Sequence, residues 1–320
     1  MRFTTHIDLD VIPLYDFEKT VHKYTLYGTD WFWLTPFEVH SKSAMWTATR
    51  LLDEKPVGLR LKPQGSFQKP CVSLTVFSED ILSNENEREV AETISWSLGL
   101  KENIMGFYAL AENFPALKQA RDDLCGMRIA VNPRLFDLVL LAHTLQAATY
   151  GRTAKMIRLV YGNYGRCLEF DGKKIIVSPS AKEMMKTKKL ELMSKCKVGY
   201  RATNIISNTN VITCGNFPSL PDLRRMSIKD ARQSLRELKG IGEYSADIVL
   251  FGIHPCFPVD SWSASIFAGL FGIDSGDKTS NLVRTLRQFA AGEFADWQGY
   301  AYDYLINDLK LLSRSFGITI

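Results

Sequence analysis

The sequence predicts an α+β protein in which an N-terminal antiparallel-sheet domain precedes a larger all-α region. Up to about residue 90, short β-prone runs alternate with Gly and Pro, whereas apolar residues recur at helical spacing from "NEREVAETISWSLGL" onward. At 320 residues and 46% hydrophobic content, the chain is long enough for two or three domains. We expect an α+β domain over 1–115 and a helical core over 116–320, packed as one body.

Three runs in the N-terminal part are expected to be strands. They are "DWFWLT" at 30–35, "GLRLKP" at 58–63 and "CVSLTVF" at 71–77. Each is rich in β-branched or aromatic residues or alternates in polarity, and "PQG" at 63–65 marks a turn. Short strands joined by turns of this kind favour an antiparallel sheet.

Two stretches of the helical region have clear boundaries. The apolar segment 135–165 predicts two buried helices around a break near residues 146–151. The segment "DGKKIIVSPSAKEMMKT" then predicts a turn followed by a helix initiated by proline, with Ser178 or Ser180 near its N-cap.

Composition and cysteine spacing narrow the class of protein. A net charge of +4 permits a polyanionic partner without requiring one. Asp8 and Asp10 stand where a secretory signal would need an apolar core, and no apolar run reaches membrane-spanning length. We therefore expect a cytosolic or nuclear monomer without a membrane partner. The six cysteines are scattered and predict no metal site: Cys71, Cys125, Cys167, Cys196, Cys214 and Cys256.

A short glycine turn lies in "LRELKGIGEYSADIVLFGIHPCFPVDSW" (235–262). Apolar or small residues at seven positions fit two helices that meet at a tight turn, namely Leu235, Leu238, Gly240, Ile241, Gly242, Ala246 and Val249. The first helix is expected to end at Gly240 and the second to begin after Gly242, with Ile241 filling the gap between them. The pattern predicts a helix-hairpin-helix.

Such a turn can bind a DNA backbone without regard to base sequence. Its amides lie at a helix N-terminus, and glycine lets a phosphate approach closely. The residues expected to meet the backbone are Lys239, Gly240, Ile241, Gly242, Tyr244 and Ser245. The cations Arg224, Arg225, Lys229, Arg232, Arg236 and Lys239 suit phosphate contact. The alternatives are an ordinary helical hairpin with a glycine cap and a solvated basic face.

One carboxylate follows the hairpin at a fixed distance. Asp260 ends the proline-rich loop "HPCFPVDSW" and stands 18 positions after Gly242, immediately before the apolar helix "SWSASIFAGLFG". On composition alone it is expected to be the N-cap of that helix. Its spacing from the hairpin matters for the resemblance described next, which makes it the candidate catalytic residue.

Together, these motifs resemble the helix-hairpin-helix superfamily of DNA base-excision glycosylases. "CKVGYRATNII" (196–206) is similar to the family's "GYRA" segment, and "WQGYAYDYLINDL" (297–309) is similar to its last core helix. The antiparallel N-terminal domain is like that of the 3-methyladenine DNA glycosylase II and 8-oxoguanine DNA glycosylase branches. The resemblance implies two helical lobes with an active-site cleft between them and, as partner, double-stranded DNA containing a damaged base.

In that family the hairpin holds the strand beside a flipped-out nucleotide. The resemblance implies that an ionised Asp260 stabilises the oxocarbenium character that develops at C1′ and can orient the attacking water. It implies no cofactor beyond a possible monovalent cation held by hairpin carbonyls near Leu238 and Ile241. It also implies a wedge residue in the break between the two buried helices, with Gln146 and Tyr150 as candidates.

At three positions the sequence departs from family patterns, and these departures indicate which branch of the glycosylase superfamily it resembles. Tyr244 stands where members that also cut the strand carry a Schiff-base lysine. Tyr302 replaces the glutamine of the "GWAQ" segment that reads 8-oxoguanine, and no cysteine follows Cys256 to build an iron–sulfur cluster. The resemblance thus favours a monofunctional glycosylase for alkylated purines such as 3-methyladenine. The alternatives are a bifunctional 8-oxoguanine-type glycosylase and lyase with a rearranged lysine, and a non-catalytic damage-binding module.

The expected base pocket is aromatic because an alkylated purine is often cationic and stacks on electron-rich rings. The candidate pocket residues are Tyr244, Trp262, Trp297 and Tyr302. For the two tryptophans, packing in the core is an equally good interpretation.

Overall fold

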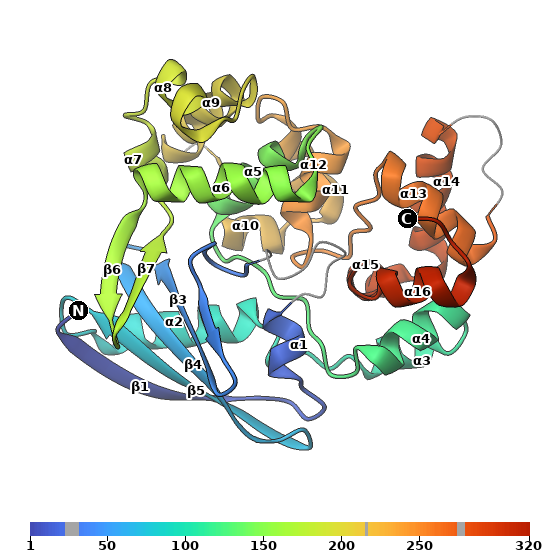
Figure 1. Ribbon diagram of the computed structural model, residues 1–320, viewed down its shortest axis with the longest axis horizontal. Coiled ribbons are helices and arrows are strands. Elements are labelled where there is room, and N and C mark those ends of the chain that lie inside the picture. Colours follow the sequence, from blue (N-terminus) through green and yellow to red (C-terminus); the bar gives the residue numbers. More distant parts are fainter. Residues whose placement is uncertain (23–31, 215–216, 274–278) are drawn as a thin grey trace.

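The computed structural model describes residues 1–22, 32–214, 217–273 and 279–320. A five-stranded sheet with one helix on its face occupies one end of the molecule, and two groups of helices occupy the other (Figure 1). The predicted α+β class is confirmed. No helix in the described part of the chain combines the length and the hydropathy needed to span a membrane.

The sheet is antiparallel with strand order β1-β5-β4-β3-β2. Its strands are β1 (Phe3–Asp10), β2 (Val39–Ser41), β3 (Ala44–Arg50), β4 (Pro56–Ser66) and β5 (Lys69–Ser78). Alternate residues of β4 and β5, such as Leu59, Leu61 and Leu74, are fully buried in one core with Ile94 of α2 (Asn84–Ser97). Two of the three predicted strand runs thus form the centre of the sheet, because their period-two pattern places one apolar face under this helix.

The prediction of a third strand, at "DWFWLT", is wrong for residues 32–35, the part of it that the structure describes. Asp30 and Trp31 lie outside the described residues, and residues 32–35 form bends and irregular structure. The Glu38 carboxylate accepts hydrogen bonds from the backbone N–H groups of Trp33 (3.1 Å) and Leu34 (2.7 Å). A side chain therefore takes the donors that a neighbouring strand would have paired, and aromatic content alone misidentified the segment.

A hairpin covers the opposite face of the sheet and interrupts the region expected to be all-α. It consists of β6 (Arg166–Phe170) and β7 (Lys173–Val177), which pack mainly along β3. The ring of Phe170 lies on Gly58 of β4, where a Cβ would come within 2.5 Å of it. The Asp171 carboxylate at the turn accepts from Trp46 Nε1 (2.6 Å) and Arg60 (2.8 Å). The hairpin thus fastens the first helical lobe to the sheet.

The first helical lobe contains α5 to α12. Its helices are α5 (Leu135–Leu145), α6 (Tyr150–Tyr164), α7 (Ala181–Met184), α8 (Lys189–Cys196), α9 (Arg201–Thr213), α10 (Leu220–Arg225), α11 (Ile228–Arg236) and α12 (Glu243–Leu250). The predicted pair of helices in 135–165 is confirmed as α5 and α6. Ser180 is the N-cap of α7 in a capping box, whereas Ser178 donates a hydrogen bond to Asp137.

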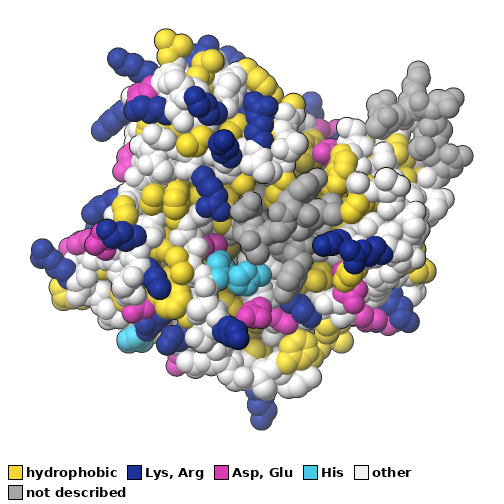
Figure 2. All heavy atoms as spheres, in the orientation of Figure 1, with side chains coloured by type: hydrophobic (Ala, Val, Ile, Leu, Met, Phe, Trp, Pro, Cys, Tyr) yellow, Lys and Arg dark blue, Asp and Glu magenta, His cyan; other side chains and the backbone are white. Residues whose placement is uncertain are grey.

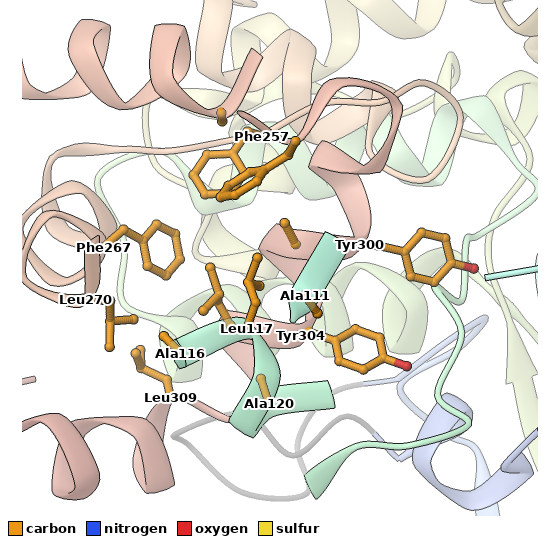
Figure 3. Close-up of a cluster of buried hydrophobic side chains, with 14 of the residues drawn as sticks. Ala111, Ala116, Leu117, Ala120, Phe257, Phe267, Leu270, Tyr300, Tyr304 and Leu309 are labelled. Carbon is orange, nitrogen blue, oxygen red and sulfur yellow. The ribbon is translucent and has the colours of Figure 1, made fainter. Parts of the chain in front are cut away.

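The second helical lobe joins two distant parts of the sequence. It combines α3 (Met105–Ala111) and α4 (Pro115–Asp123) with α13 (Ser261–Phe271), α14 (Thr279–Glu293), the 3₁₀ turn η1 (Ala295–Trp297), α15 (Gln298–Asn307) and α16 (Leu309–Phe316). Figure 3 shows Leu117 and Ala120 of α4 facing Tyr304 and Leu309 in one buried cluster. The helices on either side of residue 115, where the sequence suggests a domain boundary, therefore share this core. The short helix α1 (Phe17–Val21) lies beside the sheet.

Candidate active site

A cavity of about 570 Å³ opens between the two helical lobes. Its walls come from α5, α6 and α12 on one side, and from the start of α13 and the second half of α15 on the other. The sheet domain adds Phe32 and Trp33, and the Trp33 indole N–H is held by Ser97 Oγ (2.7 Å) and the Val131 carbonyl (3.1 Å). A mostly apolar cavity of this size with a few polar groups fits a small planar ligand.

The predicted helix-hairpin-helix is present as α11, a turn over 237–242, and α12. Gly240 has φ +76°, and a Cβ there would come within 2.2 Å of Asn204 Nδ2 in α9. Ile241 is buried, as its expected packing role requires. Asn208 of α9 accepts from the Lys239 N–H (2.8 Å) and donates to the Lys239 carbonyl (3.0 Å). Helix α9 therefore holds the turn from behind, and the turn leaves its other side open.

The residues predicted to meet a DNA backbone divide by exposure. Lys239, Gly240 and Gly242 are exposed, and Gly242 caps α12 without a side chain. Ile241 and Ser245 are buried. Tyr244 is half-buried and lines the cavity. An approaching phosphate could thus reach the backbone around the two glycines and the Lys239 side chain.

The cations near the hairpin are not all available to a ligand. Arg232 is paired with Asp247 (2.8 Å), and the Arg224 guanidinium lies 4.2 Å from the Trp96 ring centroid. Arg225 pairs with Asp222 at the surface. Lys229, Arg236 and Lys239 are exposed and form no ion pair within the described residues. These three suit phosphate contact best.

Asp260 lies at the N-terminus of helix α13 and also lines the cavity. Its Oδ1 accepts hydrogen bonds from the Ser263 N–H (2.9 Å) and the Ser263 Oγ (2.8 Å), and the Asp260 N–H donates back to Ser263 Oγ (3.0 Å) to complete a capping box. The N-cap interpretation and the catalytic interpretation are therefore compatible. The cap fixes the side chain at the N-terminus of the helix, where it faces the cavity.

Two tyrosines, Tyr244 and Tyr302, lie near this carboxylate, and a third, Tyr150, whose pKa burial also raises, lies near both of them. Burial raises the pKa of Tyr244, and the Asp260 carboxylate adds to that rise. Burial likewise raises the pKa of Tyr302, with further contributions from Tyr244, Asp260 and Tyr150. Tyr302 is seated among phenylalanines, with ring centroids 5.5 Å from those of Phe251 and Phe257. The three phenols therefore stay neutral at physiological pH and present ring faces and hydroxyls to the cavity.

The two tryptophans predicted for the pocket have different locations. Trp262, in the first turn of α13, lines the cavity and is 42% exposed. Trp297 is absent from the cavity wall and packs against Phe107 (6.4 Å) and Tyr300 (5.9 Å). Its ring lies directly on Gly106 of α3, where a Cβ would come within 2.6 Å of it. For Trp297 the structure favours the alternative interpretation, core packing.

Neither predicted wedge candidate projects from the loop between α5 and α6. Gln146 Nε2 donates to the Gly240 carbonyl (2.7 Å) and to Ser245 Oγ (3.1 Å). Tyr150 begins α6 and lines the cavity. The buried Arg201 of the "GYRA" segment donates to the carbonyls of His143 (3.1 Å) and Gln146. This loop is thus tied to the hairpin on one side and to α9 on the other.

Sequence reasoning missed two carboxylates of the cavity. Asp137, in the first turn of α5, is buried and accepts from Ser178 Oγ (3.0 Å). Burial raises the pKa of Asp137, while Arg134 opposes the rise. Asp303 is also buried and accepts from the Asn307 amide (2.9 Å). A carboxylate inside the apolar run "LFDLVLLAH" was a usable signal, because an unpaired charge is costly there. Phe32 and Trp33 carried no such signal.

Of the hairpin carbonyls predicted to hold a monovalent cation, one already accepts a hydrogen bond. The Leu238 carbonyl accepts from the Ile241 N–H (3.1 Å) inside the turn. No group of three or more His, Cys, Asp or Glu side chains in the described part of the chain is arranged to hold a metal ion. The cation at the hairpin stays a prediction.

Two curated proteins are similar to the chain in sequence. A "Probable N-glycosylase/DNA lyase" of Methanothermobacter thermautotrophicus is 25% identical over 248 residues, which cover 70% of this chain and 76% of that protein. A "DNA-3-methyladenine glycosylase" of Bacillus subtilis is 25% identical over 224 residues, which cover 68% and 71%. No family model matches the chain.

Solved structures show the same fold. A 3-methyladenine DNA glycosylase from Archaeoglobus fulgidus superposes with a TM-score of 0.75 at 18% identity, covering 98% of this chain and all of that one. An 8-oxoguanine glycosylase/lyase of Clostridium acetobutylicum, bound to DNA, gives a TM-score of 0.65 at 17% identity and covers 88% of this chain and 98% of that one. In its motifs, its fold and its sequence relatives, the chain is similar to the helix-hairpin-helix superfamily of DNA glycosylases.

Proposed function

We propose that this DNA glycosylase is monofunctional and releases alkylated purines, such as 3-methyladenine, from double-stranded DNA. The observation that carries the proposal is the meeting of Asp260, Tyr244 and Tyr302 in one cavity beside the hairpin, where the described lining residues include no lysine. A Schiff-base mechanism needs an amine within reach of C1′. Hydrolysis assisted by a carboxylate needs no such amine.

The proposed reaction uses few protein groups. The exposed glycines of the hairpin and Lys239 hold the strand, and the target nucleotide leaves the stack to enter the cavity. As the N-glycosidic bond lengthens, positive charge develops at the sugar, and the ionised Asp260 stabilises it. Because Ser263 fixes the carboxylate through two hydrogen bonds, little reorganisation is needed when the charge appears.

Aromatic walls support the preference for alkylated purines. Tyr244, Trp262 and Tyr302 line the cavity, and each ring face attracts a cationic base by about 0.5 to 2 kcal/mol. Two further buried carboxyl groups line the same cavity, namely Asp137, which is paired with Arg134 (3.3 Å), and Asp303. A neutral base gains none of this electrostatic attraction, so the environment discriminates by charge.

The bifunctional alternative is favoured by the names of two similar proteins, because the M. thermautotrophicus relative and the C. acetobutylicum structure are both described as a glycosylase and lyase. Lys239 is the amine nearest to the required position along the sequence. It is exposed at the turn and is not among the residues that line the cavity. A lyase reaction at this site would need the turn to move.

A lesion panel tests the proposal. Purified protein is incubated with duplexes that each carry one defined lesion, and products are separated with and without hot alkali. We expect release of alkylated purines, strand cleavage only after alkali, and no covalent adduct with borohydride. An adduct would establish the lyase alternative, and release of 8-oxoguanine in preference to alkylated bases would reject the proposed substrate class. Binding without any release would indicate a damage-binding module.

A further inference from the structure

The chain carries a concentrated run of exposed lysines at residues 182–197, called here the lysine segment. It contains six lysines and two glutamates, a net charge of +4. Residues 224–239, which lead into the hairpin, also carry six cations and two acids. These two segments together hold +8 in a chain whose net charge is +4, so all other residues sum to −4. The net positive charge of the protein is therefore concentrated in these two segments of one helical lobe.

The acids of the lysine segment do not neutralise it. Glu183 is paired with Arg50 of the sheet domain (2.9 Å) and completes the capping box of α7. Glu191 is paired with Lys195 (2.6 Å). Five lysines remain exposed and form no ion pair within the described residues, and they are Lys182, Lys186, Lys188, Lys189 and Lys197. A cluster of unpaired like charges is unfavourable unless a counter-charge is bound.

Helix α9 connects the lysine segment to the hairpin. Lys197, at the end of α8, has φ +57° and starts the turn into α9. Two asparagines of α9 contact the hairpin. Asn204 lies against Gly240, and the Asn208 side chain forms hydrogen bonds with the backbone N–H and carbonyl of Lys239. Lys and Arg side chains gather over α6 to α9 in Figure 2, with few acidic side chains between them. The hairpin and the lysine segment thus border the same helix.

We propose that the lysine segment binds the backbone phosphates of the duplex that flanks the damaged base. The inference rests on the proposed function, because it takes duplex DNA as the partner. A duplex presents one phosphate charge per about 1.7 Å of its axis. Each lysine that binds a phosphate displaces condensed counterions from the duplex into solution, which favours binding. Because salt screens charges over about 8 Å at physiological ionic strength, these lysines act only on phosphates that lie close to them.

Undamaged duplexes of two lengths test this surface. The variant replaces Lys182, Lys186, Lys188 and Lys189 by Gln, and the control replaces Lys42, Lys62, Lys69 and Lys101, four exposed lysines of the N-terminal part. Affinities are measured for duplexes of about 12 and about 24 base pairs from about 50 to 200 mM salt. The longer duplex alone has arms that can reach beyond the hairpin to the lysine segment.

We expect the wild type and the control to bind the long duplex with a steeper salt dependence than the short one. In the variant, the slope for the long duplex should fall by about one for each lysine that no longer neutralises a phosphate. Unchanged slopes, or equal reductions in variant and control, would overturn the inference. Lysine-dependent binding of phosphatidylserine vesicles with unchanged duplex slopes would assign the surface to a membrane instead. The probes contain no lesion, so failure of the proposed glycosylase reaction would leave this readout intact.

Discussion

At the scale of single residues, Asp260 has two tasks that one substitution separates. Asp260→Asn keeps the shape and can still cap α13, but it removes the charge that would stabilise the oxocarbenium ion. We expect base release to be lost while duplex affinity stays within about tenfold of the wild type. Single-turnover release of 3-methyladenine and fluorescence anisotropy measure the two effects. Full activity of the variant would move the catalytic role to Asp137 or Asp303, the other carboxylates of the cavity.

Tyr244 tests the substrate class. If its ring stacks on the flipped base, Tyr244→Ala should lose about 1 to 3 kcal/mol of binding, and Tyr244→Phe should lose little. The loss should be larger for a cationic base than for a neutral one, because only the positive charge is attracted by the ring quadrupole. Affinities of the Asp260→Asn background for duplexes that carry either an alkylated, cationic purine or an adenine at the same position measure both. Small and equal losses would mean that Tyr244 only packs the hairpin.

At the scale of elements, the hairpin glycines have separable roles. Gly240→Ala should lower the urea midpoint strongly, because the residue has φ +76° and its Cβ would clash with Asn204. Gly272→Ala is the matched control, since Gly272 has φ +62° but open space around it. Gly242→Ala has neither strain nor clash and should fold normally while binding duplex DNA more weakly. Unchanged duplex affinity in Gly242→Ala would argue against phosphate contact at this glycine.

Elements were predictable where the signal is local. The hairpin and the pair α5 and α6 follow from glycine spacing and apolar periodicity within one short window. The β6–β7 hairpin was missed because its strands have five residues each and gain stability from distant partners, as Phe170 does on Gly58.

The candidate site was predictable to a similar extent. Asp260 and Tyr244 are placed by their distance from the hairpin glycines, and both line the cavity. Trp297 is the last residue of a 3₁₀ turn that directs it toward α3, a path that helical periodicity does not encode. Phe32 and Trp33 reach the cavity from about a hundred residues away along the chain, so no local pattern could reveal them.

At the scale of the whole molecule, one buried carboxyl group is expected to set part of the pH dependence of stability. Asp308 lies where α15 meets α16, and burial, with the nearby Asp123 carboxylate, raises its pKa to about 7. The folded protein therefore keeps a proton that the unfolded chain releases near pH 4. The free energy of unfolding should accordingly fall as the pH rises from about 4 to 7.

Asp308→Asn removes that titration. We expect its melting temperature to exceed that of the wild type by a few degrees at pH 8, with the difference shrinking below about pH 5. The exposed Asp296→Asn is the control and should follow the wild type at every pH. A variant that keeps the wild-type pH slope would show that another group carries the dependence.

Trp33 links the sheet domain to the chemistry of the cavity. Its indole is fixed by Ser97 and the Val131 carbonyl, and with Phe32 it forms a wall that neither helical lobe supplies. A protein shortened to its two helical lobes would therefore lack part of the cavity wall. The same wall offers a place to redesign: changing ring size at position 33 alters the space for the base without touching Asp260, and it would retune selectivity from outside the catalytic lobes.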